Sequence, residues 1–188
     1  MNNQKTKAGY EYLLAYKLCV PIYDLTVEFV EKNISRFSRT GDQMIQAARS
    51  GMQNIAEGNK QQGMKGYIKL SGVARGSLEE LLKDYHAFAR QNKIEILFKE
   101  KAYREIREVG EIWGIIKKYP ALPDQPNFPN LPNDKKVAVN LMITLINQAN
   151  YLIDRLIASL KDKHMKVGGL TEELYRKRVE HQSKRIHD

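Results

Sequence analysis

The side chains best suited to chemistry form two polar groups about twenty positions apart. Asn54 and Glu57 are three residues apart, a spacing that places two side chains on one side of a helix. Arg75 and Glu79 are four residues apart, and Glu80 follows directly. If two helices bring these groups together, the carboxylates could bind a metal or act in acid–base chemistry. They could also form a buried hydrogen-bond network that joins the helices.

We favour the network, made by Asn54, Glu57, Arg75 and Glu79, over a metal or catalytic site. Di-metal helical bundles need Glu-x-x-His pairs, and this spacing does not occur in the chain. The four histidines are dispersed, without the spacing of metal ligands: His86, His164, His181 and His187. Nucleophilic-serine motifs, phosphate loops and Cys-x-x-Cys pairs are also absent. The sequence therefore predicts a protein that is not an enzyme and that needs neither a metal nor a cofactor.

Basic residues cluster around these groups and indicate an anionic partner. The net charge is +9, and residues 36–76 contain seven basic residues against two acidic ones. A solvated surface position is the simpler interpretation for any single lysine. As a cluster, however, they predict phosphate contacts without sequence preference. The candidate nucleic-acid contacts are Arg36, Arg39, Arg49, Lys60, Lys65 and Lys69. A basic arm near the end could add to them: Arg176, Lys177, Arg178, Lys184 and Arg185.

Small residues are frequent near the polar groups, among them Gly51, Gly72 and Gly76. We favour close packing of two helices over a glycine-lined phosphate cradle, because no strand–loop–helix pattern surrounds these glycines. Cys19, the only cysteine, lies on an apolar stripe near Pro21 and is predicted to be a core residue rather than a nucleophile. A single cysteine allows no internal disulfide and is typical of a reducing cytoplasm.

Helices must position these residues, since apolar residues recur at helical spacing through most of the chain. Pro21 predicts a kink in the first helix, and Thr40 with Gln43 predicts a capping box for the second. Five of the six prolines fall within 119–134, which is typical of an extended connector. The expected helices cover about 9–34, 40–58, 64–90, 92–118 and 135–166, with a short last helix after 171.

The helix expected over 135–166 has two apolar stripes and therefore needs more than one neighbour. It could dock across its own bundle or against another subunit. We favour the subunit, because four earlier helices can close a bundle among themselves. The predicted fold is all-α: an antiparallel up-down four-helix bundle over 1–118, a Pro-rich linker over 119–134, and an additional C-terminal helical suffix over 135–188.

Two stretches of the sequence resemble a known family. Residues 43–58 read QMIQAARSGMQNIAEG, and residues 70–81 read LSGVARGSLEEL. Together they resemble the four-helix-bundle family of 23S ribosomal RNA intervening-sequence proteins, which includes the accessory variability determinant of diversity-generating retroelements. The resemblance covers roughly residues 10–118. Ile45 and Gln46 stand where relatives often carry basic residues, and Met52 stands where a proline is usual.

The resemblance implies a basic bundle that assembles into a ring-like pentamer. It also implies nucleic acid as a partner and, for the retroelement relative, a reverse transcriptase. We therefore expect a non-catalytic homo-oligomer that binds RNA or RNA/DNA non-specifically through phosphates. The alternative is a protein–protein adaptor that uses the apolar helix over 135–166. No run of about 18 apolar residues predicts a membrane span, and the first residues lack the apolar stretch of a signal peptide, so we expect a cytoplasmic protein.

Overall fold

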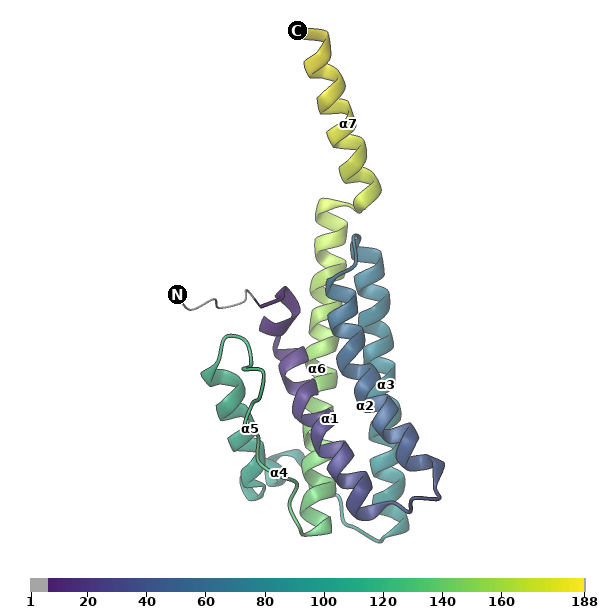
Figure 1. Ribbon diagram of the computed structural model, residues 1–188, viewed down its shortest axis with the longest axis vertical. Coiled ribbons are helices and arrows are strands. Elements are labelled where there is room, and N and C mark those ends of the chain that lie inside the picture. Colours follow the sequence, from purple (N-terminus) through teal and green to yellow (C-terminus); the bar gives the residue numbers. More distant parts are fainter. Residues whose placement is uncertain (1–6, 188) are drawn as a thin grey trace.

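The computed structural model describes residues 7–187, and helices are the only regular structure in that range (Figure 1). This confirms the predicted all-α bundle. No helix among the described residues is long and apolar enough to cross a membrane. The elements are the 3-10 helix η1 (Gly9–Tyr12) and the α-helices α1 (Leu14–Asn33), α2 (Arg39–Asn59), α3 (Met64–Gln91), α4 (Lys99–Glu105), α5 (Arg107–Lys118), α6 (Lys135–Val167) and α7 (Leu170–His187).

Four long antiparallel helices form the bundle, and the fourth of them is α6. The helix α2 packs between α1 and α3, and α6 closes the bundle by packing along both α3 and α1 (Figure 1). The segment that we expected as the fourth helix, residues 92–118, is instead divided into α4 and α5 and lies outside α1 and α6. The largest buried side chains come from all four bundle helices and include Leu18, Phe29, Met44, Ile55, Leu78, Tyr85, Leu141 and Met142.

The two apolar stripes of α6 explain this arrangement. Nine consecutive residues, 138–146, are buried, so no side of α6 faces water there. One side packs against α1 and α3, and another packs against α4 and α5. The second stripe is thus covered within the chain, which corrects our preference for a subunit contact. Residues 135–167 belong to the bundle rather than to a suffix.

The proline-rich segment between α5 and α6 is extended and packs on the bundle. Leu122 and Leu131 are buried, and the Leu131 N–H donates to Glu28 Oε2 at 2.8 Å. At the start of the segment, the buried Lys17 ammonium donates to the Ile116 and Tyr119 carbonyls at 2.7 and 2.8 Å. These contacts fix the path by which the chain returns from the end of α5 to the start of α6.

The helix ends follow local signals, with small shifts from the predicted positions. Ser38, and not Thr40, caps α2, since Ser38 Oγ accepts the Thr40 N–H at 3.2 Å. Asp134 caps α6 by accepting the Val137 N–H at 2.9 Å. The first expected helix is divided at Leu13 into η1 and α1, and α1 continues through Pro21 without interruption.

Candidate nucleic-acid interface

The six predicted nucleic-acid contacts are all exposed, but the structure distributes them along α2 and beyond its ends. Arg36 and Arg39 lie where α2 begins, and Arg49 lies near its middle. The lysines lie at the other end, around the turn between α2 and α3. Since the 21 residues of α2 span about 30 Å, the arginines at its start are far from the lysines. The six residues therefore do not form one patch.

Two further exposed lysines lie at the level of the α2–α3 turn because α3 and α6 are antiparallel. Arg75 Nε lies 3.2 Å from Asp154 Oδ2, which sets the register between these helices. Moving six residues back along α3 and six forward along α6 places Lys69 beside position 160, so the exposed Lys161 and Lys163 lie at the same level. We define the basic end as Lys60, Lys65, Lys69, Lys161 and Lys163. The sequence does not single out Lys161 and Lys163, because the predicted fold puts their helix outside the bundle.

No lysine of the basic end has an ion pair with a described carboxylate. The Lys60 ammonium lies 5.8 Å from the centre of the Tyr10 ring, a cation–π contact. Glu172 lies near Lys65, but its carboxylate accepts the Gly169 N–H at 2.9 Å. Hydrogen bonds from the backbone N–H groups of Glu172 and Gly169 lower the pKa of the Glu172 carboxyl, and Lys65 lowers it further. Apart from the contact of Lys60 with Tyr10 and the attraction between Lys65 and Glu172, these ammonium groups are available to an external anion.

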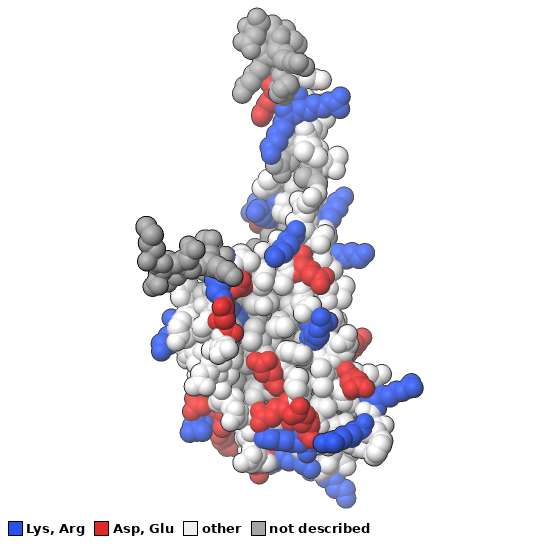
Figure 2. Space-filling view, in the orientation of Figure 1, with Lys and Arg blue, Asp and Glu red and all other residues white. Residues whose placement is uncertain are grey.

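Figure 2 shows how charge is distributed on one face of the molecule. Asp and Glu side chains gather mainly over the lower half, where Lys and Arg side chains lie among them, whereas the projecting helix α7 carries several Lys and Arg side chains. Arg176 and Arg178 of the predicted basic arm are exposed on α7, and Arg176 donates to the Val167 carbonyl at 2.8 Å. The side chains of Lys184 and Arg185 lie outside the described residues. The arm thus extends the positive charge beyond the basic end.

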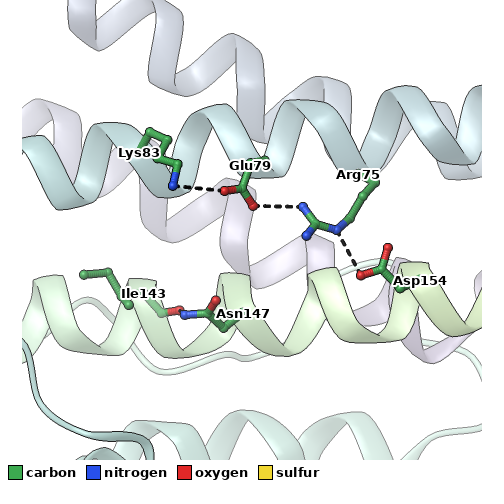
Figure 3. A network of polar contacts seen from close by, with 6 residues as sticks. All are labelled: Arg75, Glu79, Lys83, Ile143, Asn147 and Asp154. Carbon is green, nitrogen blue, oxygen red and sulfur yellow. Dashed lines mark hydrogen bonds and ion pairs between the residues drawn. The ribbon is translucent and has the colours of Figure 1, made fainter.

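The predicted polar network is divided into two smaller networks. Arg75 bonds Glu79 at 3.0 Å and Asp154 at 3.2 Å, and Lys83 contacts Glu79 at 3.3 Å (Figure 3). The hydrogen bond from Arg75 is the main reason that the pKa of Glu79 is lowered. The Arg75 side chain is 30% exposed, so this network is at the surface and joins α3 to α6. We had expected Arg75 to be buried and to face α2.

The second network joins α2 to α3 through small hydroxyl groups. The Asn54 amide donates to the Ser50 carbonyl at 2.9 Å and to Ser50 Oγ at 3.0 Å. Ser50 Oγ lies 2.8 Å from Ser77 Oγ across the helix pair. No described contact joins Asn54 to Arg75, and Glu57 is exposed on α2. The same two helices approach closely at Gly51, where an added Cβ would lie 2.6 Å from Leu78 Cδ2.

The remaining reactive residues lie apart from one another. Among the residues whose side chains the structure describes, no group of three or more His, Cys, Asp or Glu is placed so that it could hold a metal ion. Cys19 is fully buried in α1, and burial raises the pKa of its thiol to about 12. Of the groups of polar side chains described above, the basic end therefore has the clearest chemical potential, because its ammonium groups could bind an anion.

Comparison with known proteins identifies one match. The family model described as 23S rRNA-intervening sequence protein matches residues 11–114. The match spans α1 to α3 and most of the α4–α5 segment, and it ends before the proline-rich segment. No curated protein and no solved structure matches the chain.

Proposed function

Because the chain belongs to the family of 23S rRNA-intervening sequence proteins, we propose that it is a non-catalytic protein that binds nucleic acid, RNA in particular. The observation that supports this most directly is the basic end, where five exposed lysines have no ion pair with a described carboxylate. Lysine ammonium groups contact phosphates as point charges and do not distinguish bases. The binding that we propose is therefore non-specific in sequence.

We further propose that the chain acts as a homo-oligomer, with the pentamer implied by the family resemblance as the leading arrangement. Repetition of the basic end around a ring would bring many ammonium groups close together. The summed field would then attract a polyanion more strongly than one subunit does. The mass in solution, compared with the 21.7 kDa of one chain, tests this directly.

A salt titration tests the proposed phosphate contacts. If about five phosphates are neutralised at each site, the logarithm of the affinity for duplex RNA or DNA should fall against the logarithm of salt with a slope of about −4 to −5. In the double variant Lys65→Glu with Lys69→Glu, we expect the slope to become shallower by about 2 and binding to weaken at every salt concentration. Fluorescence polarisation with a labelled duplex measures both quantities.

A matched variant separates the basic end from net charge. Lys117→Glu with Lys118→Glu makes the same change in charge at two exposed positions near the end of α5. This control should keep the slope of the unmodified protein. Undetectable binding at low salt, or an equal loss in both double variants, would contradict the proposal.

The adaptor function is a second candidate, and the shape of the C-terminal region favours it. The helix α7 projects beyond the bundle (Figure 1). It exposes apolar side chains at 56%, 69% and 45% of their area, namely Leu174, Tyr175 and Val179. An uncovered apolar group on a projecting helix is typical of a protein-binding element. A reverse transcriptase is the partner that the family resemblance suggests. The sequence predicted that the helix over 135–166 would contact the protein partner, but that helix packs within the bundle as α6.

A further inference from the structure

A pocket of about 620 Å³ lies between α3, α6 and the segment that carries α4 and α5, away from the basic end. Aromatic side chains from three helices line it: Tyr103 from α4, Trp113 from α5 and Tyr151 from α6. Tyr103 is 43% exposed and Tyr151 is 61% exposed, so the rings are open to solvent. The pocket has the size of sites that bind small planar molecules.

Hydrogen bonds hold two of these rings in position. The Trp113 indole N–H donates to Gln148 Oε1 at 2.7 Å, and the Gln148 amide donates to the Tyr103 hydroxyl. Gln148 therefore connects α6 to both α4 and α5 and fixes the angle of each ring. Rings that are already ordered lose little conformational entropy when a ligand stacks on them.

The pocket also offers polar groups beside the rings. The Asn147 amide donates to the Ile143 carbonyl at 2.9 Å, and no described residue donates to its side-chain oxygen. Figure 3 shows Asn147 on α6, between Ile143 and Asp154 along the helix. Amide groups next to an aromatic surface can meet the hydrogen-bonding edge of a nucleobase.

The charges around the pocket select for an anion. Lys99 lines it, and no Asp or Glu is among the described lining residues. At its rim, the Arg155 guanidinium lies 6.0 Å from the centre of the Tyr151 ring. Neither Lys99 nor Arg155 has an ion pair with a described carboxylate. Stacking rings with cations beside them are the combination that binds single-stranded nucleic acid.

We propose that this aromatic pocket binds an unpaired base of single-stranded RNA, with Lys99 and Arg155 on the flanking phosphates. The proposal rests on the nucleic-acid binding proposed above and adds a preference for unpaired bases. From Gln148 to Lys163 is about 22 Å along α6, and ten nucleotides of one strand span about 34 Å. One short strand could therefore contact the pocket and the basic end together, whereas the bases of a duplex remain stacked inside it.

The test uses Trp113, which is the only tryptophan of the chain and lies in the pocket. The full-length protein is titrated with a ten-nucleotide oligoadenylate RNA, and with an RNA duplex of the same length. We expect the single strand to quench the Trp113 fluorescence and the duplex to leave it unchanged. Tyr151→Ala should weaken binding of the single strand roughly tenfold, because one stacking surface is lost. Tyr151→Phe keeps the ring and should bind within about twofold of the unmodified protein.

Tyr12→Ala is the matched control, because Tyr12 is a half-exposed tyrosine on η1, far from the pocket. It should bind the single strand as the unmodified protein does. If polarisation detects binding but Trp113 fluorescence and the Tyr151→Ala affinity do not change, the pocket proposal is wrong and the basic-end proposal stands. If neither RNA binds at low salt, both proposals are wrong. A fluorescence change equal for strand and duplex would also overturn the preference for unpaired bases.

Discussion

Cys19 shows at the residue scale how burial changes side-chain chemistry. In the folded protein the pKa of its thiol is about 12, against an ordinary value of 9.0. Between pH 9 and 12 the unfolded chain therefore loses a proton that the folded chain keeps, and the contribution of Cys19 to stability falls as the pH rises. The expected loss is about 1.4 kcal/mol per pH unit above pH 9. Urea unfolding at pH 8, 9 and 10 measures it.

Cys19→Ala isolates this effect from other alkaline changes. The variant should be less stable at pH 8, because a core side chain is shortened. The difference from the unmodified protein should then shrink as the pH rises above 9, since alanine does not ionise. Parallel stability curves for the two proteins would show that the thiol does not contribute in this way.

Glycines show how far the sequence determines a residue's role. The pattern predicts close packing for Gly51, Gly72 and Gly76 alike, and the structure confirms this only for the first. A Cβ at Gly51 would lie 2.6 Å from Leu78 Cδ2, whereas a Cβ at Gly72 or Gly76 would have no neighbour within 4 Å. A glycine indicates that two helices could approach each other closely at its position. Which face of α3 meets a neighbour depends on the whole bundle, and the local sequence does not contain that information.

The candidate site illustrates the same limit. The exposure of all six basic residues follows from their type, and the separation of Arg36 and Arg39 from the lysines follows from the length of α2. The addition of Lys161 and Lys163 could not be predicted, because it requires the register between α3 and α6. The contact between Arg75 and Asp154 on α6 could not be predicted either, because it depends on the same register.

At the scale of elements, the choice of the fourth bundle helix was the main error. Residues 92–118 and 135–166 both carry apolar stripes, and we chose the segment that comes first in the chain. The prolines between them indicate a boundary. The structure shows that this segment is anchored by Leu122 and Leu131, so it is a packed connection. The two-sided apolar pattern of α6 was the available signal, since a helix at the centre of a fold needs neighbours on several sides.

Lys17 joins two elements, and its removal should be costly. It is 4% exposed, its ammonium donates to the carbonyls of Ile116 and Tyr119, and burial lowers its pKa. Lys17→Met keeps the length of the side chain but leaves these carbonyls without a donor. We expect the free energy of unfolding to fall by about 3 kcal/mol, measured by urea denaturation.

The control for Lys17 is Lys32→Met on the same helix, where the lysine is exposed and has an i,i+4 ion pair with Glu28. That variant should change stability by less than about 0.5 kcal/mol. Limited proteolysis adds a second readout: Lys17→Met should be cleaved faster within residues 119–134, because the start of that segment is no longer held against α1. Equal stability and equal cleavage in the two variants would refute a structural role for Lys17.

At the scale of the whole molecule, the fold separates the apolar core from the proposed binding surfaces. The bundle of α1, α2, α3 and α6 carries most of the core, with α4 and α5 packed outside it. The basic end and the aromatic pocket lie on the surface of this bundle at different levels of α6. The helix α7 projects beyond both (Figure 1), and Arg176 of α7 donates to the Val167 carbonyl at the end of α6. We therefore expect that each proposed binding surface can be altered without unfolding the bundle.

Two truncations test this division, and they have opposite expected outcomes. Deleting residues 170–188 removes α7 and leaves every bundle helix intact, so the free energy of unfolding should change by less than about 0.5 kcal/mol. Deleting residues 119–188 also removes α6, which exposes the buried faces of α1 and α3, so that chain should aggregate or fail to unfold cooperatively. Circular dichroism and the mass in solution distinguish the two.

If the shorter deletion keeps RNA affinity within about threefold, the basic end suffices for binding, and α7 is left for a protein partner. If RNA binding is lost with α7, the basic arm and not the basic end carries the phosphate contacts.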